Sequence, residues 1–346
     1  EIYQCDWSSD VCSSDLEFKH SLASSIVNFG YRDTHVHLID TPGYPDFLGQ
    51  SLNALAAVET ALIVINAQNG IEMITRRMMQ WARERGLCRM IVINKIDADN
   101  VNLPALLSNI QSAFGKECLP INLPAQNGKT VVDCFFNPAG DADFSSIAAA
   151  HRALVEQVVE VDETLMEKYL EQGEISAEQL HAPFEQALRD GHLVPVCFTS
   201  ARNGAGVPEL LDVLARLAPN PAEGNPPLFY KGEGESATAF KAEPDPAKHV
   251  LAHVFKIVVD PFVGKLAAFR VFQGTVKRDS QLFIGDGRKP FKVGHLYVLQ
   301  GKEHVETDAC VPGDIGAVTK VEEITLDAVL HDSHRSEEHT SELQSH

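Results

Sequence analysis

Residues 88–97 read CRMIVINKID, an apolar run that ends in a short polar group. Such a run is typical of a strand that is buried on both faces of a parallel sheet. Residues 61–67 (ALIVINA) and 193–199 (LVPVCFT) have the same character, and residues 35–40 (HVHLID) alternate before they become apolar. Helical patterns lie between or after these runs, at 45–58, 72–85, 103–115 and 207–217. The alternation predicts an α/β fold with a doubly wound, mostly parallel sheet, whose ligand loops lie at the carboxyl ends of the strands.

The rest of the chain departs from this alternation. Residues 116–192 interrupt it with a predicted hairpin and long acidic helices over about 146–190, so we expect an inserted subdomain within an α/β domain that spans 17–225. Residues 226–247 are rich in Pro, Gly and Glu and predict a linker. Residues 248–330 contain short strands separated by turns, a pattern that predicts a small β-barrel as the second domain.

Composition excludes several classes of protein. The 346 residues carry 48 acidic against 29 basic side chains, a formal net charge of −19, and 44% of them are hydrophobic. No apolar run approaches the length of about 18 residues that a membrane span needs. The acidic balance argues against coating nucleic acid by charge alone, although a local basic patch stays possible. Seven cysteines without a CxxC pair argue against zinc and against a disulfide framework, so we expect a reduced, cytoplasmic protein.

The two ends of the chain are related to each other at the level of DNA. Residues 6–16 read DWSSDVCSSDL and residues 335–345 read RSEEHTSELQS. Codons for the second segment, read on the opposite strand in a shifted frame, encode the first. This relation is typical of a translated sequencing adapter, so we exclude residues 1–16 and 335–346 from the fold prediction as artefactual tails.

Three polar motifs follow predicted strands in order: Asp40-Thr41-Pro42-Gly43, Asn94-Lys95-Ile96-Asp97 and Thr199-Ser200-Ala201. Taken singly, the first is explained by a turn and the second by a polar helix start. All three at strand ends, where an α/β sheet presents ligand loops, favour a guanine-nucleotide site.

Several residues of the second and third motifs suit parts of a guanine base. The Asp97 carboxylate can accept the N1 proton and the exocyclic amine protons of guanine, a pair that adenine does not offer. Lys95 would lay its alkyl stem along the base, and Asn94 would tie neighbouring loops together. The backbone N–H near Ala201 would meet the guanine carbonyl, with Thr199 and Ser200 completing the loop.

The first motif suits the phosphate end of the nucleotide. Asp40 would hold the water shell of Mg²⁺, and the Gly43 amide would sense the γ-phosphate, because only a residue without Cβ lets the backbone approach so closely. Thr41 and Pro42 complete this loop.

Gly128-Lys129-Thr130 mimics the end of a phosphate-binding loop. The full pattern requires another glycine where the chain has Leu123, so we interpret these residues as a hairpin turn. The 346 residues contain no G-x-x-x-x-G-K-[ST] pattern. Because that loop should precede Asp40 by several tens of residues, we expect a partial chain with negligible affinity for GTP, which a fluorescent-GTP titration would test.

The sequence resembles the translational GTPases, and specifically elongation factor G or one of its paralogues. The stretches that carry the resemblance are IDTPGYPDF (39–47), VINKIDADN (92–100), FTSARNGAGVPELLDVL (198–214), FKIVVDPFVGKLAAFRVFQGT (255–275) and PGDIGAV (312–318). The resemblance implies a P-loop GTPase-type sheet with an insertion, followed by the barrel. It further implies a monomeric, ribosome-associated factor that binds GTP or GDP with Mg²⁺ and hydrolyses GTP on the large subunit. Its partners would be ribosomal RNA and proteins, with no DNA or membrane involved, and its step would be translocation or ribosome recycling.

Two stretches depart from the family pattern. Tyr44 stands directly after the DTPG motif, where the family usually has a histidine that positions the attacking water. A neutral phenol can donate a hydrogen bond but cannot reproduce the two nitrogens of an imidazole. Residues 17–22 (EFKHSL) also differ from the usual end of the first switch. We therefore keep two alternatives: a nucleotide-dependent ribosome-binding module with vestigial hydrolysis, and a related release or ribosome-protection GTPase.

Three weaker candidates have plainer interpretations. His35 and His37 would need a third ligand to hold a metal, and a solvent-facing strand edge explains them better. The acidic segment 156–178 suits either a basic ribosomal protein or a solvated face. Phe262 and Lys265 suit either ribosomal RNA or a turn beside the core.

Overall fold

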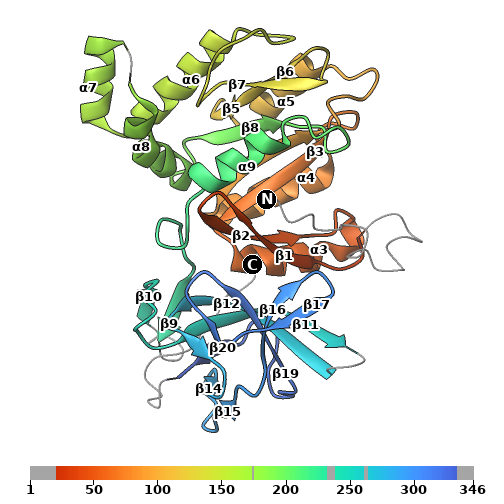
Figure 1. Ribbon diagram of the computed structural model, residues 1–346, viewed down its shortest axis with the longest axis vertical. Coiled ribbons are helices and arrows are strands. Elements are labelled where there is room, and N and C mark those ends of the chain that lie inside the picture. Colours follow the sequence, from red (N-terminus) through yellow and green to blue (C-terminus); the bar gives the residue numbers. More distant parts are fainter. Residues whose placement is uncertain (1–20, 174, 232–237, 261–263, 333–346) are drawn as a thin grey trace. The chain divides into compact units, whose positions relative to one another are not determined.

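A computed structural model describes residues 21–173, 175–231, 238–260 and 264–332 (Figure 1). The predicted tails at 1–16 and 335–346, residues 17–20 and Phe262 lie outside the described residues. The chain divides into two compact units. Among the described residues, the sheet unit consists of those within 59–219 and 223–225, and the barrel unit of those within 21–58, 220–222 and 226–332. Nowhere in the described ranges is a helix both long and apolar enough to span a bilayer.

The sheet unit is built on four parallel strands in the order β3-β4-β8-β5. Strand β4 is buried along almost its whole length and β8 along all of it, as their apolar sequences predict. The predicted α/β architecture is confirmed. The strands are β3 (Thr60–Asn66), β4 (Cys88–Asn94), β5 (Cys118–Pro120) and β8 (Val194–Phe198), and the helices that alternate with them include α4 (Met73–Glu84), α5 (Leu103–Phe114) and α9 (Val207–Arg216).

The insertion within the sheet unit has the predicted hairpin and three helices. The hairpin pairs β6 (Asn122–Ala125) with β7 (Thr130–Asp133). The helices are α6 (Ile147–Val159), α7 (Glu163–Gln172) and α8 (Ala177–Arg189). Side chains cap two of these helices, since Ser146 accepts the Ala149 N–H and Asp162 accepts the Leu165 N–H.

The barrel unit contains a curled antiparallel sheet of eight strands in the order β15-β14-β20-β11-β12-β19-β16-β17. Its core is lined by alternate residues of the long strands, among them Ala252, Val254, Phe269 and Val271. The eight strands are β11 (Leu251–Asp260), β12 (Gly264–Gln273), β14 (Gln281–Ile284), β15 (Phe291–Lys292), β16 (Leu296–Gln300), β17 (Glu303–Glu306), β19 (Ile315–Thr319) and β20 (Val329–His331). Two further short strands, β13 (Val276–Lys277) and β18 (Ala309–Cys310), pair with each other in a separate ladder.

The segment expected to be a linker contains a second hairpin of the barrel unit. Strands β9 (Leu228–Lys231) and β10 (Thr238–Lys241) pair antiparallel. The buried Phe229 of this hairpin packs with Phe240 and with Phe272 of β12. The sequence signal for this packing was the pair Phe229 and Phe240. The Pro- and Gly-rich composition of the segment obscured that signal.

Strand β2 (Thr34–Asp40), which was expected among the parallel strands, pairs instead with β1 (Ser25–Tyr31) in an antiparallel hairpin. The turn has two residues, and Arg32 in it has a φ of 50°, which suits a tight hairpin. The alternation of HVHL is the pattern of a half-buried antiparallel strand, whereas the parallel strands of the sheet unit are continuously apolar. The motif that begins at Asp40 therefore follows a hairpin.

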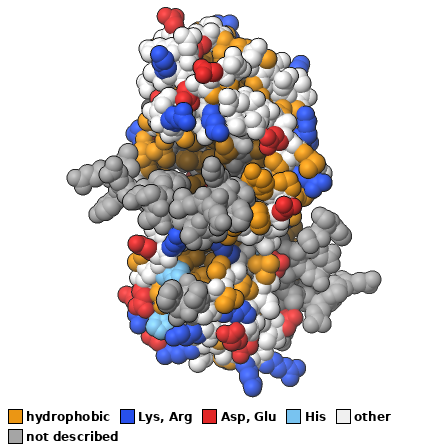
Figure 2. All heavy atoms as spheres, turned by 90° about the vertical axis from the view of Figure 1, so that its right-hand side faces the viewer, with side chains coloured by type: hydrophobic (Ala, Val, Ile, Leu, Met, Phe, Trp, Pro, Cys, Tyr) orange, Lys and Arg blue, Asp and Glu red, His pale blue; other side chains and the backbone are white. Residues whose placement is uncertain are grey.

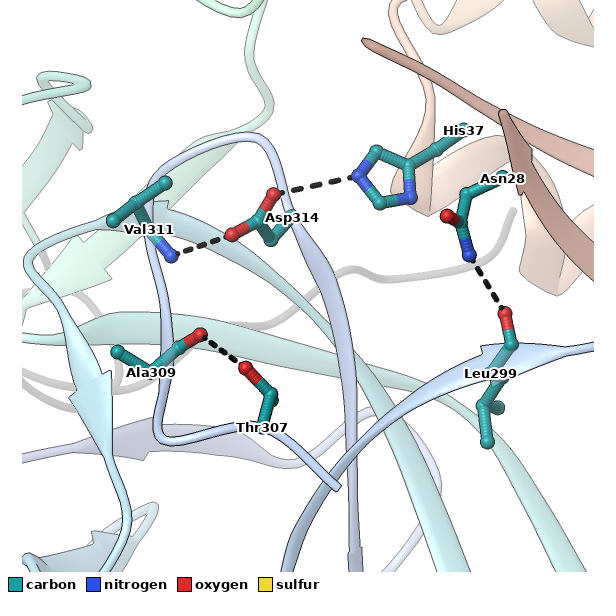
Figure 3. Close-up of polar contacts among 7 residues, drawn as sticks. All are labelled: Asn28, His37, Leu299, Thr307, Ala309, Val311 and Asp314. Atoms are coloured by element: carbon teal, nitrogen blue, oxygen red, sulfur yellow. Dashed lines mark hydrogen bonds and ion pairs between the residues drawn. The ribbon is translucent and has the colours of Figure 1, made fainter. Parts of the chain in front are cut away.

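Polar contacts hold this hairpin to the curled sheet within the barrel unit (Figure 3). The Asn28 side-chain amide donates to the Leu299 carbonyl at 3.1 Å. His37 Nε2 lies 3.4 Å from a carboxylate oxygen of Asp314, whose other oxygen accepts the Val311 N–H at 2.8 Å. His35 is exposed as expected, but His37 is directed at Asp314 rather than at solvent.

Candidate functional site

The carboxyl ends of β4 and β8 bring the second and third motifs into contact within the sheet unit. The Thr199 N–H donates to the Ile93 carbonyl at 2.8 Å, and the Ile96 N–H donates to the Thr199 carbonyl at 3.2 Å. Thr199 is 3% exposed and Ile96 is 2% exposed, so the two loops share a packed floor. Parallel pairing of β4 with β8 places both strand ends at one edge, as the sequence predicted.

Asn94 ties the two loops together at their rim. Its side-chain oxygen accepts the Lys95 N–H at 2.8 Å and the Ala201 N–H at 3.0 Å. Lys95 has a φ of 64°, a conformation that a lysine rarely adopts and that the bond from Asn94 stabilises. The Ala201 N–H, assigned from the sequence to the guanine carbonyl, is thus engaged by Asn94, and a nucleotide would have to share or displace that bond.

Ser200 fixes the orientation of the Asp97 carboxylate. The fully buried Ser200 donates its hydroxyl to Asp97 Oδ1 at 2.6 Å, and its own oxygen accepts the Asn203 N–H at 3.4 Å. The hydrogen bond from Ser200 lowers the pKa of the Asp97 carboxyl below its ordinary value, and the nearby charge of Arg202 acts in the same direction. Asp97 is therefore a carboxylate at neutral pH, held in one orientation.

This arrangement is suited to reading one edge of a purine. A carboxylate has about four lone-pair sites, so the bond from Ser200 leaves Asp97 the capacity to accept two further N–H donors. Guanine offers two such donors side by side, whereas adenine would leave those two acceptor sites of the carboxylate unfilled, at a cost of several kcal/mol. The exposed Lys95 provides an alkyl stem next to this edge.

Asn122 supports the same site and was not identified from the sequence. It is 1% exposed, its side-chain oxygen accepts the Phe198 N–H at 2.7 Å, and its amide donates to the Phe198 carbonyl at 3.2 Å. Phe198 directly precedes Thr199, so this buried amide holds the end of β8 in place. The available signal was an asparagine between the apolar residues Ile121 and Leu123.

The first motif lies in the barrel unit, at the end of β2. Asp40 and Gly43 are exposed, Thr41 is half-buried and Pro42 is buried. The Pro42 carbonyl accepts the Ser51 hydroxyl at 3.1 Å, which holds the loop against helix α3 (Leu48–Ala54).

Tyr44 follows this loop and is 52% exposed. It precedes a short 3₁₀ turn, η1 (Pro45–Phe47), and its carbonyl accepts the Phe47 N–H at 3.1 Å. With α3 and a second 3₁₀ turn, η2 (Leu55–Ala57), this turn makes up the helical stretch predicted at 45–58.

The donor set of the first motif fits Mg²⁺. The described part of the chain holds no cluster of three or more His, Cys, Asp or Glu side chains able to bind a metal. Mg²⁺ does not need such a cluster, because it is usually bound by one or two carboxylates together with waters and substrate phosphates. A single exposed carboxylate such as Asp40 meets that requirement.

The structure bears on two of the weaker candidates, the acidic segment 156–178 and Lys265. The acidic segment 156–178 is not one helix, since it covers the end of α6, all of α7 and the start of α8. The Lys265 ammonium donates to the Glu322 carbonyl at 2.6 Å, a contact inside the barrel unit that accounts for its position.

Two family models match the chain. The model described as "Elongation factor Tu GTP binding domain" covers residues 8–220, more than half of the chain, and "Elongation factor G domain 2" covers residues 249–331.

Similar proteins point the same way. An elongation factor G-like protein of Mycobacterium tuberculosis (strain CDC 1551 / Oshkosh) is 30% identical over 352 residues, covering 93% of this chain and 49% of that protein. Another of the same description, from Thermotoga maritima, is 28% identical over 315 residues, covering 88% of this chain and 46% of that protein. A crystal structure of a Thermus thermophilus protein matches with a TM-score of 0.79 and 30% identity, covering 95% of this chain and 48% of that one. The chain thus spans about half the length of these relatives. It belongs to the translational GTPase family, with an elongation factor Tu GTP-binding domain followed by an elongation factor G domain 2.

Proposed function

We propose that the protein is a ribosome-associated GTPase of the elongation factor G type, which binds guanine nucleotides with Mg²⁺ and hydrolyses GTP. The observation that carries the proposal is the bond from the buried Ser200 to Asp97, together with the bond from Ala201 to Asn94. These bonds hold a charged carboxylate ready at the end of a parallel sheet before any base is present. Such preorganisation is what selective recognition of a polar base requires.

At the base end, we assign discrimination to Asp97, which accepts the N1 and amine protons of guanine. Asn94 keeps the two loops at a fixed separation through the Ala201 N–H. Lys95 covers the face of the base with its alkyl stem. Ser200 bonds the carboxylate directly, and Thr199 bonds the Ile96 peptide that precedes it.

At the phosphate end, we assign Asp40 to the water shell of Mg²⁺ and the Gly43 N–H to the γ-phosphate, in the loop that Thr41 and Pro42 complete. When bound, Mg²⁺ neutralises charge on the β- and γ-phosphates. Tyr44 occupies the position next to Gly43, where its hydroxyl can donate a hydrogen bond to water. A phenol is a poor general base at neutral pH, so we expect slow hydrolysis in which Tyr44 orders the water rather than removing its proton.

We assign the ribosome as partner and either translocation or recycling as the step that hydrolysis drives. The match to elongation factor G domain 2 and the similarity to elongation factor G-like proteins support this assignment. On the face drawn in Figure 2, acidic and basic side chains are interspersed rather than gathered by sign. We therefore expect contacts on that face to rest on individual groups rather than on a broad charged field.

One alternative has an observation in its favour. Tyr44 in place of the usual histidine suits a module that binds the ribosome in a nucleotide-dependent way and hydrolyses GTP slowly or not at all. A release or ribosome-protection GTPase would share the same base-recognition loops.

The proposal is tested by binding and turnover in the full-length protein. We expect GDP and GTP to bind in the micromolar range or tighter, ADP to bind at least about 100-fold more weakly, and ribosomes to stimulate GTP turnover. Nucleotide binding without ribosome-stimulated turnover would favour the binding module. Equal affinity for GDP and ADP would rule out the proposed function.

A further inference from the structure

We propose that the turn between β6 and β7, residues 126–128, positions the base-recognition loop, with Gly128 and Asp143 as the positioning residues. The inference rests on the proposed guanine site and adds to it a specificity-determining role for the insertion. It also explains why a glycine stands at the head of the Gly128-Lys129-Thr130 stretch, which does not belong to a phosphate-binding loop.

The turn touches the backbone of the second motif directly. Gly128 is buried, and a Cβ atom placed on it would lie 2.3 Å from the Ile96 carbonyl oxygen and 3.0 Å from the Ile96 carbonyl carbon. Contacts this short do not occur between real Cβ atoms and backbone atoms, so any other residue here must push one of the two loops away. Gly128 also has a φ of 73°, which independently favours glycine.

Asp143 holds the turn in this position. Gln126 and Asn127 have φ values of 55° and 60°, so with Gly128 three consecutive residues adopt the left-handed conformation. One carboxylate oxygen of Asp143 accepts the Asn127 N–H and the other accepts the Gly128 N–H, both at 2.9 Å. The backbone N–H of Asp143 donates to the Pro124 carbonyl at 2.8 Å, which fixes Asp143 to strand β6. A conformation that is costly for two non-glycine residues persists because this carboxylate stabilises it.

The Ile96 peptide is thereby held from two sides. Its N–H donates to the Thr199 carbonyl at 3.2 Å, and its carbonyl lies against Gly128. Asp97 is the next residue, so the direction of its carboxylate depends on both contacts. Recognition groups must be held within about 0.5 Å of their productive position, and the turn supplies one of the two supports.

The test compares GDP with inosine diphosphate, which lacks the exocyclic amine that Asp97 is proposed to read. In the full-length protein we expect GDP to bind more tightly than inosine diphosphate, and Gly128→Ala to reduce this preference by about tenfold or more. The matched control is Gly173→Ala. Gly173 has a φ of 75°, and a Cβ placed there has no atom within 4 Å, so it introduces the same backbone strain without a contact. A variant that only lowers the folded fraction weakens both nucleotides equally and leaves the ratio unchanged.

Asp143→Ala provides a second measurement if Gly128→Ala does not fold. It introduces no clash, and we expect faster amide hydrogen exchange at Ile96 and Ala98 together with a smaller loss of GDP preference. Asp143→Asn keeps one acceptor oxygen and should recover part of both.

The outcomes separate the two proposals. If the wild-type protein does not bind GDP, the proposed function is ruled out. The amide hydrogen exchange rates then still decide whether Asp143 positions the loop. Wild-type binding with an unchanged GDP preference in Gly128→Ala, or unchanged exchange in Asp143→Ala, would overturn the positioning role.

Discussion

The loops after β4 and β8 differ from the loop after β2 in how their polar groups are held. In the first pair, side chains cross-link the loops, with the buried Ser200 bonded to Asp97 and the Ala201 N–H bonded to the Asn94 side chain. In the second, Asp40 and Gly43 are exposed, and the Ser51 hydroxyl donates to the buried Pro42 carbonyl. The first region is built as a fixed template and the second as a surface loop at the end of a hairpin.

This difference fits the two ends of a nucleotide. The base is the same in GTP and GDP, so rigidly held loops suit its recognition. The γ-phosphate is present in one and absent in the other, so we expect the loop that we propose senses it to change conformation between the two states.

Removal of Asp97 should weaken GDP and GTP equally. Asp97→Ala loses two hydrogen bonds to a charged group, which we expect to cost about 3 kcal/mol or more, or at least about 100-fold in affinity. Asp40→Ala should instead weaken GTP in the presence of Mg²⁺ and leave GDP in EDTA unchanged. Equilibrium titration of both nucleotides measures the two effects.

Asp99→Ala is the matched control for Asp97, because Asp99 is a carboxylate on the same loop, two residues further along the chain. A loss of affinity in this control, or the same nucleotide profile for the Asp40 and Asp97 variants, would contradict the division between base and phosphate ends.

Removal of Asn122 should destabilise the sheet unit. Asn122→Ala leaves the Phe198 N–H and carbonyl buried without these partners, which costs about 2–3 kcal/mol of unfolding free energy. Urea denaturation measures it, with the exposed Asn109→Ala as a control that should change stability by less than about 0.5 kcal/mol. If the two variants had equal midpoints, Asn122 would not hold the end of β8.

Removal of the Ser200 hydroxyl should make base recognition sensitive to acid. Ser200→Ala loses one hydrogen bond to Asp97, which costs about 1.5 kcal/mol of binding energy. Because this bond lowers the pKa of Asp97, its loss raises that pKa. As the pH falls from 7 towards 4, GDP affinity in the variant should therefore begin to drop at a higher pH than in the wild type.

The pH dependence of GDP binding is the informative measurement for Ser200. Ser112→Ala, which removes a hydroxyl bonded to the Ser108 carbonyl on the exposed side of α5, is the control and should keep the wild-type profile. Identical profiles for Ser200→Ala and the wild type would mean that the serine does not tune the carboxylate.

Tyr44→Phe should have the smallest effect and should act on turnover alone. It removes one hydroxyl from an exposed side chain, so we expect ribosome-stimulated hydrolysis to fall by about two- to tenfold at unchanged GTP affinity. Single-turnover GTP hydrolysis on ribosomes measures it. Unchanged turnover would remove Tyr44 from the mechanism.

The sequence was sufficient for the elements with strong periodicity. The continuously apolar runs before Asn94 and Thr199 predicted buried parallel strands, and the structure has them. Their polar ends are loops at one edge of the sheet, and recognition of a base by these loops stays a prediction. The pairing of β2 with β1 was missed, because Asn28 and Gly30 interrupt the alternation of β1. The hairpin at β9 and β10 was missed because its apolar contacts lie far away in the sequence.

The parts of the site that could not be predicted depend on long-range contacts. Asn122 reaches Phe198 across 76 residues, and the turn at Gly128 reaches Ile96 from within the insertion. No local pattern specifies such contacts, because buried asparagines and turn glycines occur in many structural settings. Only the folded arrangement brings them to the end of β8 and to the loop after β4.

The most direct test is a crystal structure of the full-length protein with Mg²⁺ and a non-hydrolysable GTP analogue. We expect the Asp97 carboxylate to lie about 2.7–3.1 Å from both N1 and the exocyclic amine of guanine, with Asp40 linked through water to Mg²⁺ at the phosphates of the same molecule. A nucleotide whose base contacts other groups, or whose phosphates lie away from residues 40–43, would contradict the assignment.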